Sequence, residues 1–287
     1  MTKLPRVFVP VQSTPLKDRI DSQIFTHYPR TIGDAIRITE QEAWVQRGSG
    51  DVEVPAYFRE IIEQVAFEAR QSEFVDQKSG VSARLTIAAL ENLVSNAERR
   101  SILNGDRRIA PRISDLPHVL PGMTGKIELV FEGEQEGPAR VGKALIGKAV
   151  KDVFRKYFPD PLQKRPRNPQ RQGEGRQGEG AAPREEAVYG QIISWFESGN
   201  AIEISDDMPL DGYYDELDKV KGLKEITLKH MDIPAGDRYH LAAAMEFVLD
   251  GLHQSSRIAK EEADHRIGYK DLVGTIFNRR SSGNEDD

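Results

Sequence analysis

Hydrophobic residues in the first half of the chain recur at the spacing of an α-helix. Between Pro55 and Arg70 they fall on one helical face, which consists of Tyr57, Phe58, Ile61, Ile62, Val65, Ala66 and Ala69. Pro55 suits the first helical turn, where its missing N–H group is not needed. The same spacing predicts a second helix that Thr86 caps and that stops at Asn104–Gly105, and a third helix over 140–157.

Shorter elements are predicted on both sides of these helices. Thr39 and Glu42 form a capping-box pattern, which predicts a short helix that opens there and ends near Gly48. Towards the end of the chain the pattern predicts a strand over 201–205 and helices over 186–197, 213–220 and 238–252. Strand patterns are rare throughout, so the expected fold class is mostly α with a few short strands.

One segment, residues 163–186, has a composition that differs sharply from the rest. It reads QKRPRNPQRQGEGRQGEGAAPREE, in which the motif RQGEG occurs twice in succession. A segment so poor in apolar residues cannot bury enough surface to offset the entropy of the chain. We therefore expect a disordered linker here, and a loose polar tail over 279–287.

Composition and charge exclude several classes of protein. The 40 basic and 46 acidic residues give a net charge of −6, which provides no general attraction for nucleic acid or anionic membranes. The basic cluster in 163–186 is interleaved with glutamates, so nucleic-acid binding there is disfavoured. Cysteine is absent, which excludes disulfides, cysteine-ligated zinc and a cysteine nucleophile. No run approaches the roughly 18 apolar residues of a membrane span, and no signal peptide is evident, so we expect a cytoplasmic protein.

The usual catalytic motifs are missing from the 287 residues. A P-loop ends in Gly-Lys-Ser/Thr, but the nearest approximations, at Gly142 and Gly147, lack the hydroxyl and lie in a helical pattern. The six histidines show no ligand-like pair at helical spacing, so we interpret them as surface or capping residues. The adjacent carboxylates of Asp206 and Asp207 should point in different directions, which favours a loop or capping role over metal binding.

Two arginines are nevertheless candidates for binding an anion. Arg19 follows Asp18 among apolar residues, where it could form a plain surface ion pair or be presented to a neighbouring subunit's nucleotide. Arg84 precedes the predicted helix start, where the helix dipole and a fixed guanidinium would together favour an anion. The alternative for Arg84 is an arginine that merely flanks a capped helix.

The segments around both arginines resemble a known family. The run over 14–29 and the run FEARQSEFVDQKSGVSARLTIAALENLVSNAERR over 67–100 resemble the magnesium-chelatase I-subunit-like ATPases of the AAA+ superfamily, which are relatives of the MoxR-type ATPases. The resemblance extends more weakly through 125–128 and 154–158, and past the linker into 194–199 and 204–207. Its most specific part is 81–100.

The resemblance implies roles for the two arginines. In this family the segment matching 16–20 carries the arginine finger, here Arg19, which acts in trans on a neighbouring subunit's site. The segment matching 80–85 opens a helix of the α-helical lid and carries the sensor-2 arginine, here Arg84. Members hydrolyse ATP with Mg²⁺ as ring oligomers, usually hexamers, and remodel a partner protein or drive metal insertion into a porphyrin.

The resemblance also implies a domain organisation. Residues 1–38 would be the end of an AAA+ core that carries the finger, and 39–162 the α-helical lid and its following helices. The linker would lead into an α-rich, partly α/β extension over 187–278. Because the P-loop and the Asp-Glu magnesium motif are not in this sequence, we expect the C-terminal part of such an ATPase, inactive by itself. The alternative function is a non-catalytic, stand-alone protein-interaction module.

Overall fold

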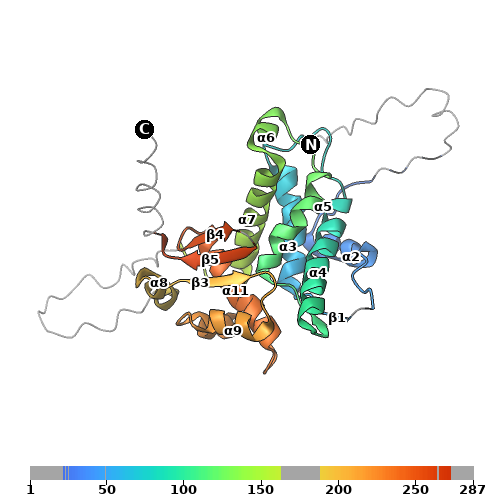
Figure 1. The fold of residues 1–287 in the computed structure, drawn as a ribbon. Helices are drawn as coiled ribbons and strands as arrows, with labels where there is room; N and C mark the ends of the chain where they lie inside the picture. The colour runs from blue at the N-terminus through green and yellow to red at the C-terminus, as the bar shows by residue number, and fades with distance from the viewer. Residues whose placement is uncertain are drawn as a thin grey trace, which may run out of the picture.

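The computed structural model describes residues 22, 24, 26–48, 50–162, 188–263 and 265–272. The predicted linker over 163–186 and the predicted tail over 279–287 lie outside these residues. The stretch 163–187, which is not described, is called the break below. Before it, helices dominate (Figure 1). They are α2 (Ile32–Glu42), α3 (Ala56–Gln71), α4 (Arg84–Asn104), the 3₁₀ helix η1 (Ile113–Val119), α5 (Leu120–Thr124), α6 (Phe131–Glu136) and α7 (Pro138–Tyr157). The short strands β1 (Asp51–Val52) and β2 (Arg108–Ile109) pair in parallel.

After the break, helices surround a small antiparallel sheet. The helices are α8 (Gly190–Glu197), α9 (Leu210–Asp218), α10 (Leu223–His230) and α11 (Arg238–Gln254). The strands are β3 (Ile202–Ser205), β4 (Ala259–Ala263) and β5 (Arg266–Lys270), in the order β3-β5-β4. The mostly α fold class is thus confirmed for the described residues. The lid and extension named in the sequence analysis remain predictions.

The long predicted helices are confirmed. Pro55 lies immediately before the first residue of α3, and Gly105 ends α4 with a left-handed φ of 69°. The helix predicted over 140–157 is α7, which begins two residues earlier at Pro138. Helices also occupy most of 213–220 and 238–252, and β3 lies within 201–205. The period of 3.6 residues therefore predicts the long helices, whereas the short α10, which buries Leu223 and Ile226, was not predicted.

The two predicted threonine caps are wrong. The helix expected to open at Thr39 is α2, which begins at Ile32, and its cap is Thr31, whose side chain accepts a hydrogen bond from the Asp34 N–H. Thr39 is instead buried inside α2, and Thr86 is buried in the first turn of α4. Their hydroxyls lie 2.8 Å apart, because each threonine faces the other helix rather than its own N-terminal amides.

Helix α11 forms the centre of the molecule. Every residue from Leu241 to Leu252 is buried, and the helix contacts α7, α9, α10 and η1. The ring of Phe247 stacks on Tyr57 of α3 at 4.8 Å and meets the edge of Phe154 of α7 at 5.8 Å. At Gly251 a Cβ atom would overlap the ring of Phe154. Residues from both sides of the break therefore belong to one hydrophobic core.

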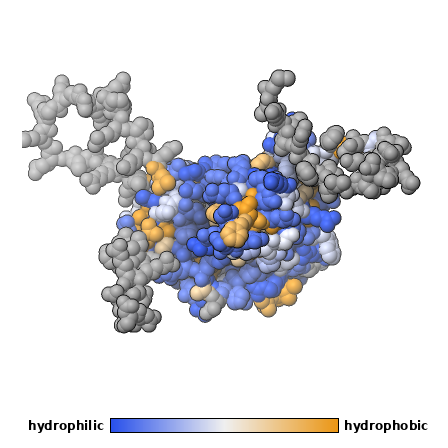
Figure 2. All heavy atoms as spheres, turned by 90° about the horizontal axis from the view of Figure 1, so that it is seen from above, coloured by the Kyte–Doolittle hydropathy of each residue, from blue (hydrophilic) through white to orange (hydrophobic). Residues whose placement is uncertain are grey.

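The surface of the described residues is largely polar. Figure 2 shows one face on which hydrophilic side chains dominate and hydrophobic ones gather in separate patches. No helix among the described ranges has the length and hydrophobicity that a membrane crossing requires.

Candidate functional site

Arg84, the predicted phosphate-binding arginine, is the first residue of α4 and is exposed. Its guanidinium has no hydrogen-bond or ion-pair partner within the described part of the chain. The preceding residue, Ala83, supplies no side-chain cap, and the backbone N–H of Arg84 donates to the Ser82 hydroxyl at 3.2 Å. The start of α4 therefore places an available guanidinium at the positive end of the helix dipole, which favours an anion, while Ser82 accepts the backbone N–H groups of Arg84 and Leu85.

A buried polar cluster lies beneath this first turn of α4. The Thr39 hydroxyl donates to the carboxylate of Glu63 at 2.5 Å, and Thr39 also contacts Thr86 at 2.8 Å. Burial raises the pKa of Glu63, although the two threonines act in the opposite direction. These contacts tie α2, α3 and α4 together and fix the direction in which α4 begins.

Arg19, the predicted arginine finger, lies outside the described residues. The structure therefore places one of the two predicted arginines, Arg84.

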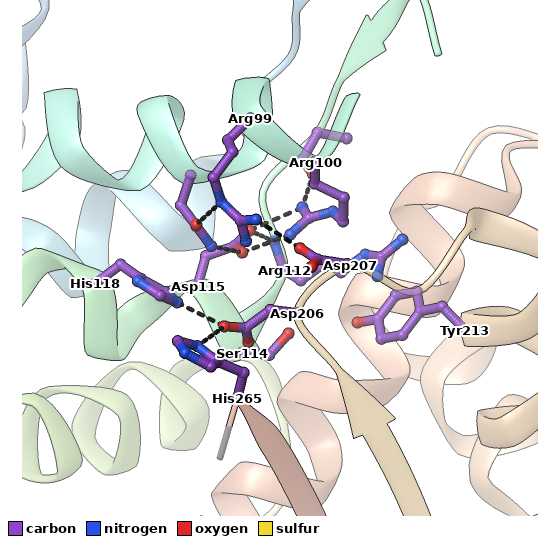
Figure 3. Close-up of polar contacts among 12 residues, drawn as sticks. Arg99, Arg100, Arg112, Ser114, Asp115, His118, Asp206, Asp207, Tyr213 and His265 are labelled. Carbon is purple, nitrogen blue, oxygen red and sulfur yellow. Dashed lines mark hydrogen bonds and ion pairs between the residues drawn. The ribbon is translucent and has the colours of Figure 1, made fainter. Parts of the chain in front are cut away.

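Asp206 and Asp207 lie in the turn after β3 and point in different directions, as predicted (Figure 3). Asp207 pairs with the exposed Arg99 at 2.6 Å. Asp206 is buried and accepts hydrogen bonds from two histidines, from Nε2 of His118 at 3.0 Å and from Nδ1 of His265 at 3.2 Å. Its carboxylate thereby joins β3, η1 and the turn between β4 and β5.

This His–Asp–His cluster was missed by sequence reasoning. His118 and His265 come from distant parts of the chain, and no spacing rule links them. A hollow of about 220 Å³ lies beside the cluster, and Ser114 also lines it. The Ser114 hydroxyl, however, is buried and donates to Glu246 at 3.4 Å, so it forms no nucleophile–base pair with His118. In this arrangement the cluster connects three elements rather than activating a nucleophile.

Next to it lies a buried ion pair, also drawn in Figure 3. Arg100 of α4 donates two hydrogen bonds to Asp115 of η1, at 2.6 and 2.9 Å. Asp115 also accepts from the Asn96 amide and from the Arg112 backbone N–H, each at 2.7 Å. Burial opposes the charge of Asp115, but Arg100 and these hydrogen bonds outweigh it, so the pKa of Asp115 lies below its ordinary value.

A second buried carboxylate, that of Glu246 in α11, has fewer hydrogen-bond partners than Asp115 in the described part of the chain, and no ion-pair partner like Arg100 there. The Tyr213 hydroxyl donates to it at 2.6 Å, while its Oε1 atom has no partner within the described residues. Burial raises the pKa of Glu246. Nearby, the Arg112 guanidinium lies over the Tyr213 ring at 4.0 Å, and burial together with Arg100 lowers the pKa of Arg112 to about 10.

One group within the described ranges has the spacing of metal ligands, namely Glu53, Asp237 and His240. The guanidinium of Arg108 already fills its centre, because it pairs with Glu53 and donates to Asp237 at 2.7 and 2.9 Å. We interpret this group as an ion-pair cluster that joins the β1–β2 pair to the start of α11.

Comparison of the chain with protein-family models, with curated proteins and with solved structures finds no match.

Adjacent arginines on α4 allow a test of the buried ion pair. Arg100→Met leaves Asp115 buried without its main counter-charge, so we expect the free energy of unfolding to fall by about 3–5 kcal/mol. The matched control is Arg99→Met, which removes an exposed ion pair and one hydrogen bond to Asn96, and should cost at most about 1–2 kcal/mol. Urea unfolding of the three proteins provides the measurement. Equal losses in the two variants would contradict the structural role of Arg100.

The pKa shift of Glu246 predicts a pH dependence of stability. Because the folded-state pKa is raised, the folded chain binds this proton more tightly than the unfolded chain. The resulting stabilisation is fully present below the unfolded-state pKa and is lost as the pH rises through the folded-state pKa. Glu246→Gln removes this loss, so the free energy of unfolding of the variant relative to the natural chain should increase as the pH rises above the ordinary pKa of a glutamate. A difference that stays constant with pH would contradict the shift.

Proposed function

We propose that this chain is the lid-bearing part of a magnesium-chelatase-like AAA+ ATPase, in which Arg84 binds a phosphate of ATP. The observation that carries the proposal is the state of Arg84, whose guanidinium is exposed and has no partner within the described residues. A guanidinium without a protein partner keeps its full set of N–H donors available for a phosphate. The resemblance over 81–100 gives this free guanidinium its nucleotide-binding role.

Contacts on both sides of Arg84 fix the backbone from which its side chain extends. Val81, three residues before Arg84, forms an isolated antiparallel bridge with Ile127. On the far side, the buried contacts of Thr39 with Glu63 and Thr86 hold α4 against α2 and α3. A guanidinium that starts from a fixed backbone loses less entropy when it binds a phosphate, because only the side chain is left to order.

The remaining parts of the reaction would come from other polypeptide segments. The 287 residues contain no P-loop, so the phosphates and their Mg²⁺ would be held by a P-loop-bearing partner subunit. The described residues fit this division, because the one group among them with the spacing of metal ligands, which contains Glu53 and Asp237, is already paired with Arg108. In a ring, Arg19 would reach a neighbouring subunit's ATP, and hydrolysis would drive remodelling of a client protein.

The test combines the purified chain with a P-loop-bearing ATPase of the same class. We expect the chain to hydrolyse no ATP alone and to stimulate hydrolysis in the mixture. Arg84→Ala should reduce the stimulated rate by about tenfold to a hundredfold, the worth of one charge-assisted contact to phosphate. Arg19→Ala should reduce it by roughly a thousandfold, as for an arginine finger.

Arg99→Met is the matched control, because it removes an exposed arginine from the same helix and should leave the stimulated rate unchanged. Stimulation that Arg84→Ala does not alter would contradict the proposed role. Binding to the partner without any stimulation would favour the alternative, a non-catalytic interaction module.

A further inference from the structure

Tyr28 connects the segment before α2 to the turn that precedes Arg84. Its hydroxyl accepts a hydrogen bond from the backbone N–H of Val81 at 2.9 Å. This contact joins residues that are 53 positions apart in the sequence. On its other side, Val81 bridges to Ile127. The turn that leads into α4 is therefore held between Ile127 and Tyr28.

Gly80, the residue before Val81, leaves room for the Tyr28 hydroxyl. Gly80 has a φ of 76°, in the left-handed region that L side chains rarely adopt. A Cβ atom at this position would lie 2.6 Å from the Tyr28 hydroxyl oxygen, but 3.9 Å from the ring carbon that carries it. The hydroxyl, rather than the ring, is thus the part of Tyr28 that requires glycine here.

The ring of Tyr28 has a separate partner, Arg70 near the end of α3. The Arg70 guanidinium lies 4.1 Å from the centre of the Tyr28 ring and 5.2 Å from that of Phe67. Its Nε atom is buried and has no hydrogen-bond partner among the residues that the structure describes. Contacts with two aromatic faces therefore hold this cation in place, in a partly dehydrated position where such contacts are strongest.

We propose that Tyr28 is a positioning residue that couples the described residues just before α2 to the orientation of Arg84. It does so through two contacts of different kinds, the hydroxyl on the Val81 amide and the ring on Arg70. A movement of the segment that contains Tyr28 is transmitted to the turn over 80–83 and so to the start of α4. The coupling is a property of the fold, whereas its consequence for nucleotide binding rests on the proposed function of Arg84.

Hydrogen exchange tests the coupling without any nucleotide. Tyr28→Phe removes the hydroxyl and keeps the ring on Arg70, so the Val81 amide should exchange about tenfold faster while the overall stability changes little. Tyr157→Phe is the matched control, because it removes a hydroxyl that donates to Glu60 at 2.6 Å, on the opposite end of α3. This control should leave Val81 unaffected. Unchanged exchange at Val81 in Tyr28→Phe would overturn the proposal.

A double-mutant cycle tests the fit between Tyr28 and Gly80. Gly80→Ala should destabilise the chain through backbone strain and through the clash with the hydroxyl oxygen. Tyr28→Phe relieves the clash but not the strain, so Gly80→Ala should shift the urea midpoint less in the Tyr28→Phe background than in the natural chain. If the midpoint shifts of the two single variants simply add in the double variant, the proposed contact between the Tyr28 hydroxyl and Gly80 is overturned.

The same variant in the stimulated ATPase assay separates the two proposals. Tyr28→Phe should lower the stimulated rate several-fold in the presence of Arg84 and have no further effect when Arg84 is alanine. If Arg84→Ala leaves the rate unchanged while Tyr28→Phe still accelerates Val81 exchange, the coupling holds and the proposed function fails. If Arg84→Ala lowers the rate but Tyr28→Phe alters neither exchange nor rate, the positioning role is overturned.

Discussion

The burial of α11 is the constraint on which the rest of the fold depends. A helix whose residues from Leu241 to Leu252 are all buried must be covered on every side. Here α7 and η1 come from before the break at 163–187, and α9 and α10 from after it. Small residues make the close approach possible, most clearly at Gly251, where the Phe154 ring occupies the space of a side chain. Neither part of the chain can cover this helix without the other.

Buried charge is the second consequence of this packing. Asp115 is supplied with a guanidinium and further hydrogen bonds, so its ionised form is stabilised inside the core. Glu246 faces the same interior from α11 with one atom that has no partner among the described residues. Since incomplete satisfaction of a buried carboxylate costs free energy, this side of the core is less stable than a fully apolar packing would be. Both carboxylates lie where η1 packs against α4 and α11. Their hydrogen bonds therefore select how these three helices pack together.

Much of the helical structure could be predicted from the sequence, because α3, α4 and α7 each bury one face and leave a period of 3.6 residues. The β4–β5 hairpin could not, since five of the eight residues over 259–266 are charged and its turn places His265, rather than a glycine, at positive φ. The predicted cap at Thr39 is wrong because the Thr39 hydroxyl donates to Glu63 of α3 and contacts Thr86 of α4. The His118–Asp206–His265 cluster needs tertiary folding to exist at all. Arg84 was predicted from its place before a helix start and from the resemblance, whereas its lack of a partner among the described residues is visible only in three dimensions.

The helices that carry Arg84 and the part of the chain beyond the break should form a single cooperative unit around α11. The most direct measurement is co-expression of residues 1–162 and 188–287 as separate chains. The shared core predicts that they are recovered as a one-to-one complex, which unfolds in one transition. Recovery as two independent folded proteins, each with its own unfolding transition, would contradict the account.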